Sequence, residues 1–158
     1  MNINVYKVRP DAKLPYRAHP EDAGMDIFYC PDTGTNNSCV WEENGKFRIP
    51  PTENCLIPTG VKIEVPEGYM LEIKNKSGIA SKRQLIVGAC VVDPGYTGEI
   101  FVNLHNIGRS TQEIEPGQKI AQAVLVPVVA CGINEVKYDL ADKETSRGSG
   151  GFGSTGQW

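Results

Sequence analysis

The clearest strand pattern in the sequence is Val61-Lys62-Ile63-Glu64-Val65, in which apolar and charged residues alternate. This period of two predicts a β-strand with one face buried and the other in water. Pro66-Glu67-Gly68 follows and predicts a turn, and the alternation resumes in Met70-Leu71-Glu72-Ile73-Lys74. Residues 61–74 therefore predict two short strands with a turn between them.

Similar signals extend in both directions along the chain. Residues 3–5 alternate, and richer apolar runs at 100–105 and 123–129 predict buried strands. Further turns are predicted where proline, glycine or asparagine occur together, at 58–60, 94–95, 106–108 and 116–117. The helix candidate is short, at 77–83. Many short strands with frequent turns predict an all-β sandwich or barrel, a single domain over residues 1–158.

The composition agrees with this fold class and excludes others. The chain holds 17 glycines and 11 prolines, so 28 of 158 positions, about 18%, hold one of these residues, against an average near 12%. Because both residues are unfavourable inside helices, a helical bundle or coiled coil is excluded. The hydrophobic fraction of 40% and the charged fraction of 22% are ordinary, so the chain is not disordered throughout.

Charge and hydropathy limit the partners and the location. The formal net charge is −3 and no basic stripe occurs, so a nucleic-acid polymer is not an expected partner. No run of 18 apolar residues is present, so no transmembrane helix or membrane partner is expected. Residues 1–7 lack the apolar core of a signal peptide. These features predict a cytoplasmic protein, and a nuclear location as well if the source is eukaryotic.

The cysteines and histidines show no metal-site pattern. The cysteines are odd in number and form no Cys-x-x-Cys pair: Cys30, Cys39, Cys55, Cys90 and Cys131. They are predicted to be reduced thiols, mostly buried as small apolar residues. His19 and His105 do not belong to a ligand-spaced cluster, so no zinc site is predicted.

Two segments depart from the strand pattern. Residues 31–47 predict a loop or a protruding hairpin, interpreted either as a tolerated surface insertion or as a partner-binding arm that carries Trp41. Residues 138–158 form a polar tail that becomes rich in glycine. Its Gly148-x-Gly150-x-x-Gly153 pattern matches a dinucleotide-binding fingerprint only formally, because too few residues follow it to form the required helix.

The glycine-rich tail has two interpretations. It is a disordered terminus, or it is a mobile lid that wraps a phosphorylated ligand. In the second interpretation Arg147 pairs with a phosphate, and Ser154 and Thr155 donate hydrogen bonds to its oxygens. Phe152 would then cover a base.

Two further segments carry residue types suited to phosphate chemistry. Asp93 precedes Pro94-Gly95, which places its carboxylate at the mouth of a hairpin, either as a turn residue or as a catalytic group. Lys76-Ser77-Gly78 combines a cation, a hydroxyl and a glycine at the expected start of the short helix. It is either an anion-binding helix N-terminus or an ordinary serine cap.

Taken in order, five segments resemble the five motifs of the trimeric dUTP pyrophosphatases (dUTPases). They are Ala23-Gly24-Met25-Asp26-Ile27, Lys76-Ser77-Gly78-Ile79-Ala80, residues 88–99, Gly117-Gln118-Lys119-Ile120-Ala121-Gln122 and Arg147 through Gly156. The resemblance spans nearly the whole chain, and five ordered motifs at compatible spacing are far more specific than any one of them.

The resemblance implies a distorted jelly-roll β-barrel or sandwich subunit in a homotrimer with three shared active sites. Residues 138–158 would be the C-terminal arm and lid. The implied reaction converts dUTP and water to dUMP and pyrophosphate, which limits uracil incorporation into DNA and supplies dUMP for dTMP synthesis. Mg²⁺ is the implied cofactor, held mainly by the substrate phosphates, with Asp26 binding the metal through a water.

The resemblance also implies roles for individual residues. Asp93 would be the general base that orients the attacking water. The implied substrate-binding residues are Lys76, Ser77, Gly78, Gly88, Tyr96, Gln122, Arg147, Phe152, Gly153, Ser154 and Thr155. Among them Tyr96 would stack beneath the deoxyribose, and the backbone near Gly88 would read the uracil edge.

The sequence departs from the family pattern at a few positions. Lys76 and Lys119 stand where arginine is common, which keeps the charge and removes the bidentate fork. Cys90 stands where glycine is common, interpreted as a small core residue or as a reactive thiol. Residues 31–47 form a longer connection than usual.

Two other functions fit parts of the pattern. The dCTP deaminases share the implied fold, but they need a glutamate and a serine pair, whereas Asp93 stands at the hairpin and Gly78 follows Ser77 here. A regulatory protein-binding module would use residues 31–47 as its contact surface. That function predicts damaged catalytic motifs, whereas Asp93 and Tyr96 are both present.

Overall fold

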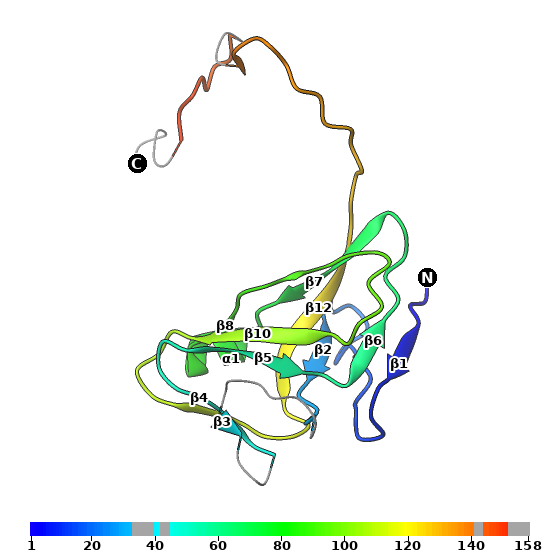
Figure 1. The fold of residues 1–158 in the computed structure, drawn as a ribbon, viewed down its shortest axis with the longest axis vertical. Helices are drawn as coiled ribbons and strands as arrows, with labels where there is room; N and C mark the ends of the chain where they lie inside the picture. The colour runs from blue at the N-terminus through cyan, green and yellow to red at the C-terminus, as the bar shows by residue number, and fades with distance from the viewer. Residues whose placement is uncertain (33–39, 42–44, 141–143, 152–158) are drawn as a thin grey trace.

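The computed structural model describes residues 1–32, 40–41, 45–140 and 144–151 (Figure 1). Within these residues strands dominate, and the short predicted helix is present as α1 at Ser77–Arg83. The strands in chain order are β1 (Val5–Lys7), β2 (Met25–Phe28), β3 (Val40–Trp41), β4 (Phe47–Ile49), β5 (Asn54–Pro58), β6 (Val61–Ile63), β7 (Tyr69–Lys74), β8 (Leu85–Val87), β9 (Val91–Val92), β10 (Phe101–Asn106), β11 (Gln112–Ile114) and β12 (Lys119–Pro127). The prediction of an all-β, jelly-roll-like fold is confirmed.

The described strands form small antiparallel sheets around a shared interior (Figure 1). The largest sheet has the order β2-β12-β7-β9, and a second has the order β5-β10-β8. Two smaller ones have the orders β11-β4-β3 and β1-β6. β12 is the longest strand and lies between β2 and β7, so it joins segments from the start and the middle of the chain.

Alternation along the strands places one apolar face of each sheet inside. In β10 the side chains of Val102 and Leu104 are buried, whereas those of Asn103 and His105 are half-buried. The largest fully buried side chains come from many strands and connections: Tyr29, Phe47, Ile27, Ile49, Ile57, Leu71, Leu85, Ile100, Leu104, Ile114 and Ile120. Burial of one such aliphatic side chain contributes roughly 1.5–3 kcal/mol, so this shared interior stabilises all the sheets together.

The strands predicted at 61–65 and 70–74 are present as β6 and β7, but they belong to different sheets. β6 pairs with β1, and β7 pairs with β12 and β9. The turn between them closes through a bond from Tyr69 N–H to the Pro66 carbonyl (3.2 Å), and it passes the chain from one sheet to the next. Local alternation therefore predicted the strands and not their partners.

The segment at 31–47 is described only in part. Its strand β3 pairs antiparallel with β4, with Val40 opposite Arg48. Residues 33–39 and 42–44 lie outside the described residues. Its interpretation as a surface insertion or as a partner-binding arm stays a prediction.

The prediction that every cysteine is a reduced thiol is wrong at Cys55. This residue, buried in β5, is disulfide-bonded. Cys30, Cys90 and Cys131 are free thiols, as predicted, although Cys131 is exposed rather than buried. Cys39 lies outside the described residues. Spacing gave no signal for a bond at Cys55, because pairing depends on which strands the fold brings together.

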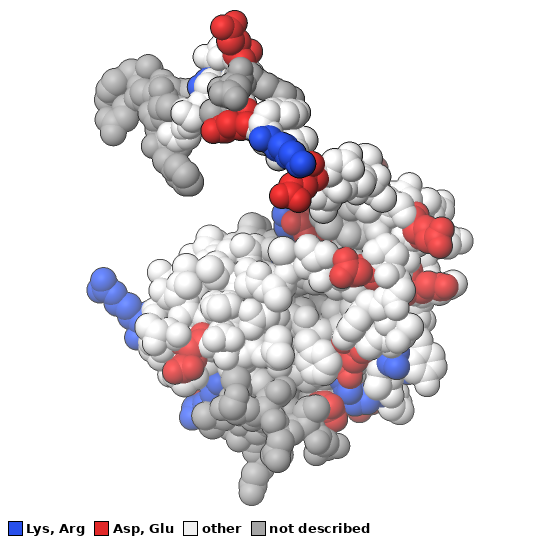
Figure 2. All heavy atoms as spheres, turned by 45° about the horizontal axis from the view of Figure 1, so that its top comes forward, with Lys and Arg blue, Asp and Glu red and all other residues white. Residues whose placement is uncertain are grey.

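The chain leaves the sheets after β12. Figures 1 and 2 show residues 128–140 running away from the body, with Val129 92% exposed and Ile133 95% exposed. On the face shown in Figure 2, the lysines and arginines of the described residues are scattered among uncharged side chains. Within the described ranges, no helix has the length and apolar character needed to cross a bilayer. The cytoplasmic location stays a prediction.

We expect Gly60→Ala to destabilise the fold more than Gly68→Ala. Both glycines have a positive φ, +72° and +80°, so alanine pays a similar conformational cost at either position. At Gly60 an added Cβ would also lie 2.6 Å from the Cβ of Ala12 and 2.8 Å from the sulfur of Cys30. At Gly68 it would meet nothing within 4 Å.

The free energy of unfolding should therefore fall by about 1–3 kcal/mol more in Gly60→Ala than in Gly68→Ala. Denaturant unfolding of the two variants measures the difference. Equal losses would show that the backbone around Gly60 relaxes and accommodates the methyl group.

Candidate active site

Asp93 lies where the chain leaves the largest sheet. The strand before it, β9, pairs with β7 through Leu71 and Val92, so the sheet sets the position of Asp93. Gly95 then turns the chain with a φ of +82°, and Tyr96 N–H donates to the Asp93 carbonyl (3.2 Å). The Asp93 side chain is exposed at this turn. Its carboxylate therefore faces water.

Asp93 and Tyr96 share a pocket of about 340 Å³. Its other walls are mostly apolar: Leu56, Val91, Val92, Glu99, Ile100 and Phe101. A larger cavity, of about 840 Å³, lies between β1, β6 and residues 94–97, and Asp93 does not line it. The smaller pocket is the stronger candidate site, because it combines an accessible carboxylate with apolar walls.

The ring of Tyr96 is held across its own loop. Its hydroxyl donates to the backbone carbonyl of Glu99 (2.9 Å). A Cβ added at Gly98 would lie 2.3 Å from the Tyr96 hydroxyl oxygen, so the ring packs directly over this glycine. The orientation of Tyr96 in the pocket therefore depends on where the Glu99 backbone is fixed.

A second group of charged residues forms around Asp26 in β2. This carboxylate is buried, and its two oxygens pair with Lys76 Nζ (2.7 Å) and Lys119 Nζ (2.6 Å). Burial by itself raises the pKa of Asp26, but the hydrogen bonds from the two lysines outweigh this effect and lower it. Lys119 also lies over the ring of Tyr16, 4.9 Å from its centroid. With two ammonium groups and one carboxylate, the cluster suits an anion.

Ser77, Gly78 and Gln122 lie beside this cluster in the chain or in the sheet. Lys76 is the N-cap of α1, and its side chain makes no capping hydrogen bond. Ser77 is therefore the first residue of the helix rather than the cap, which corrects one of the two interpretations of this segment. Gln122 lies opposite Asp26 in the sheet, and its Nε2 donates to the carbonyl of Asn75 (2.9 Å). The fold thus brings the first, second and fourth motifs together.

Gly88 is placed next to β10. Its N–H donates to the carbonyl of Asn103 (2.9 Å). An added Cβ would lie 2.3 Å from both Asn103 Oδ1 and His105 Nε2, so a larger residue does not fit this position.

Arg147 is not brought to either group. It is exposed, and its Nε donates to the carbonyl of Gly150 (3.1 Å) within one turn of the arm. Phe152, Gly153, Ser154 and Thr155 lie outside the described residues. In the described part of the chain, the ion pairs and hydrogen bonds of Asp26 and its lysines do not reach Asp93.

A directly bound metal ion does not fit the described residues. They contain no group of three or more histidine, cysteine, aspartate or glutamate side chains that could hold one. Mg²⁺ prefers several oxygen ligands, including carboxylates and waters. Both oxygens of the Asp26 carboxylate already pair with lysines. Two ammonium groups around this carboxylate suit an anion better than a directly bound cation.

Three residues near the candidate site were not predicted from the sequence: Lys119, Arg9 and Glu99. Lys119 pairs with Asp26, and Arg9 pairs with Glu99 at the end of the Tyr96 loop. Lys119 and Glu99 lie inside two of the recognised motifs, which is a signal that could have found them. Arg9 had no such signal, because its partner is far away in the sequence.

Comparisons with known proteins identify relatives of this chain. The dUTPase family model matches residues 43–156. Deoxyuridine 5'-triphosphate nucleotidohydrolases of Gloeothece citriformis and Clostridium tetani are each 40% identical to the chain, over 158 and 157 residues. The alignments cover 99% and 98% of this chain and 97% of each relative.

Solved structures show the same likeness. A dUTPase of Staphylococcus bacteriophage 80alpha with dUPNHPP has a TM-score of 0.81 and 26% identity, covering 98% of both chains. A mutant dUTPase from phage phi11 of S. aureus, described with a structural Mg(II) ion, has a TM-score of 0.75 and 25% identity. That match covers 89% of this chain and 99% of the phage chain.

We expect the stabilising effect of Asp26 to disappear in acid. Because the pKa of Asp26 is lowered in the folded protein, its ionised form stabilises the fold above the unfolded-chain pKa of about 3.9. This stabilisation is lost as the pH falls through the folded pKa. The difference in free energy of unfolding between the wild type and Asp26→Asn should be constant above about pH 5 and shrink below about pH 4.

Urea unfolding across this pH range measures the effect, with the exposed Asp11→Asn as the matched control. At neutral pH the free energy of unfolding should fall in Asp26→Asn by less than the about 3–5 kcal/mol that is typical when one partner of a fully buried ion pair is removed. The lysine side chains are 34% and 35% exposed, so water already screens them. A difference that persists unchanged to the lowest pH would contradict the role of Asp26 as an ionised partner.

Proposed function

This chain belongs to the dUTPase family and hydrolyses dUTP to dUMP and pyrophosphate, and we propose that Asp93 carries the chemistry. The observation that supports this assignment is the water-facing carboxylate of Asp93 at the apolar pocket that it shares with Tyr96. Such a pocket suits a nucleoside whose phosphates extend toward solvent.

In the proposed mechanism Asp93 accepts a proton from a water molecule while the water oxygen attacks the α-phosphorus of dUTP. A carboxylate that is accessible to water is a suitable acceptor for this proton. The bond between the α-phosphorus and the bridging oxygen then breaks. Pyrophosphate leaves with the bridging oxygen, and dUMP remains.

The Asp26 cluster and the start of α1 form the proposed phosphate site. Lys76 and Lys119 together carry one more charge than Asp26 neutralises, and both remain about one-third exposed. Ser77 and Gly78 are exposed at the start of the helix, where the first N–H groups have no acceptor within the helix. Gln122 adds a side-chain amide beside them.

The nucleoside is proposed to bind at the loop that follows β9. Tyr96 would stack beneath the deoxyribose and leave no room for a 2′-hydroxyl. Two features support this role: its hydrogen bond to Glu99 and its packing over Gly98. The backbone between Gly88 and Gly98 would pair with the uracil edge.

In one chain the described part of the arm does not reach that chain's own pocket. In a homotrimer with shared sites, the arm of one chain would reach the pocket of another. Residues 128–140 leave the body with exposed apolar side chains, among them Val136, Tyr138 and Leu140. Exposed apolar side chains along one segment are suited to burial against another copy of the chain. In the assembled enzyme Arg147 would reach a neighbour's phosphates, with Phe152 covering the base and Gly153, Ser154 and Thr155 closing around it.

Mg²⁺ is proposed to enter with the triphosphate rather than on protein ligands. The pairing of both Asp26 oxygens with lysines supports this order. It leaves Asp26 a contact with the ion only through a water.

We expect Asp93→Asn to retain nucleotide binding and to lose turnover by about 10²–10⁴-fold, the usual contribution of a general base. Pyrophosphate release from dUTP, dCTP, dTTP and UTP, with and without Mg²⁺, measures the activity and its selectivity. Asp11→Asn, an exposed aspartate outside the pocket, is the matched control. A fully active Asp93→Asn would remove Asp93 from the mechanism.

We expect a truncation after Ser146 to keep the oligomeric state and to lose most catalysis, because it removes the fifth motif and leaves residues 128–140 in place. Light scattering measures the assembly, and pyrophosphate release measures the activity. A truncation after Gly156 keeps the motif and serves as the control. Normal activity after truncation at Ser146 would contradict the role of the arm as a lid.

A further inference from the structure

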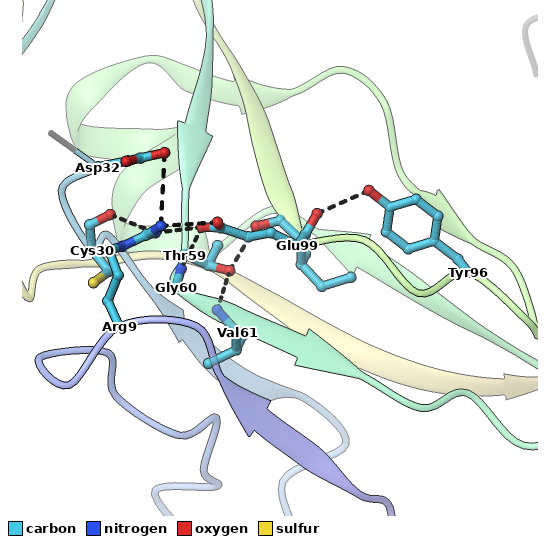
Figure 3. Close-up of polar contacts among 9 residues, drawn as sticks. Arg9, Cys30, Asp32, Thr59, Gly60, Val61, Tyr96 and Glu99 are labelled. Atoms are coloured by element: carbon cyan, nitrogen blue, oxygen red, sulfur yellow. Dashed lines mark hydrogen bonds and ion pairs between the residues drawn. The ribbon is translucent and has the colours of Figure 1, made fainter. Parts of the chain in front are cut away.

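An ion pair anchors the far end of the Tyr96 loop. Arg9, in the turn after β1, presents its guanidinium to the carboxylate of Glu99 in a two-pronged arrangement (Figure 3). Nη1 donates to Oε2 at 2.9 Å, and Nη2 donates to Oε1. The two side chains are only 20% and 11% exposed, so the pair is largely removed from water.

Arg9 is held on its other side as well. Its Nη2 donates to the carbonyl of Cys30 (3.2 Å), and Nη1 lies 3.8 Å from the carboxylate of Asp32. The Nε of Arg9 is buried with no acceptor among the described residues. A partly satisfied buried pair contributes little net stability, so its value lies more in fixing a geometry.

The Glu99 side chain has a third donor. The N–H of Gly60 donates to its Oε1 at 2.7 Å. Gly60 is itself packed against Ala12 and Cys30 and has little freedom to shift. The backbone just after Glu99 is pinned too, because Thr59 Oγ1 donates to the Ile100 carbonyl (2.6 Å), as Figure 3 shows.

This fixed residue presents the acceptor on which the orientation of Tyr96 depends. The Tyr96 hydroxyl donates to the backbone carbonyl of Glu99 (Figure 3). Both residues line the pocket that contains Asp93. The path from Arg9 to Tyr96 therefore runs through two direct contacts, one to the side chain of Glu99 and one to its backbone.

We propose that Arg9 is a positioning residue for substrate selection, which holds Tyr96 in place through Glu99 and thereby sets the preference for a deoxyribose over a ribose nucleotide. The inference rests on the proposed role of Tyr96 beneath the sugar. Loss of the clamp removes one of the restraints on Glu99, which loosens the carbonyl that orients the Tyr96 ring and admits a 2′-hydroxyl. Arg9 itself does not touch the substrate.

The test compares kcat/KM for dUTP with kcat/KM for UTP in the full-length enzyme. Arg9→Met should lower this ratio by about tenfold or more. Arg9→Lys, which keeps the charge without the fork, should give an intermediate ratio. Arg48→Met is the matched control, because it removes an exposed arginine–glutamate pair that joins Arg48 of β4 to Glu113 of β11.

A double-variant cycle separates positioning from general loosening of the fold. Tyr96→Phe removes the hydroxyl that contacts Glu99 and should itself lower the ratio. Adding Arg9→Met to Tyr96→Phe should then change the ratio little, because both substitutions break the same path. Independent effects that multiply would overturn the inference.

Folding failure does not leave the question open. If Arg9→Met unfolds because it leaves a buried carboxylate unpaired, Arg9→Met with Glu99→Gln removes that charge and is measured instead.

An unchanged ratio in the Arg9 variants, with a lowered ratio in Tyr96→Phe, would overturn the inference alone. An unchanged ratio in Tyr96→Phe would overturn the sugar-recognition role and the inference together, and absence of dUTP turnover in the wild type would overturn the mechanism.

Discussion

The pairing of β12 with β2 on one side and β7 on the other is the constraint on which the site depends. In this register Gln122 lies opposite Asp26 in β2 and opposite Lys74 in β7. Three segments far apart in the sequence are thereby placed side by side, and the start of α1 follows directly from the end of β7. A slip of one residue in β12 would turn Gln122 to the opposite face of the sheet. The same slip would bring the buried Ala121 and Ala123 into water.

Two carboxylates organise the charges on the two parts of the site, and they do so in different ways. Asp26 is buried between two lysines that keep part of their surface in water, so it fixes the positions of two positive charges. Glu99 is held by Arg9 and by a backbone N–H, and it offers its carbonyl to a tyrosine. Burying a charged group costs free energy unless partners satisfy it. In both cases the partner comes from a distant segment, so the buried charged group is paired only in the complete fold.

The elements that local pattern predicted well are those whose signal is contained in a few residues. Alternation predicted β6 and β7, an apolar run predicted β10, and the Pro94-Gly95 turn placed Asp93 at a loop tip where its side chain is exposed. Helix geometry was harder, since the cap of α1 is Lys76 rather than Ser77. The disulfide at Cys55 had no local signal, because pairing of cysteines depends on which residues the fold brings within bonding distance.

Periodicity and turn residues were enough to predict an all-β chain, and the resemblance to the dUTPase motifs pointed to Asp93, Tyr96 and Asp26 as candidate site residues. Short stretches of sequence carry these signals, because the alternation of a strand and the backbone requirement of a turn involve only adjacent residues. The sheet partners, the two lysines on Asp26 and the clamp of Arg9 on Glu99 came from the tertiary structure alone. Each joins residues at large sequence separation, and such contacts are selected by packing of the whole interior rather than by any local preference.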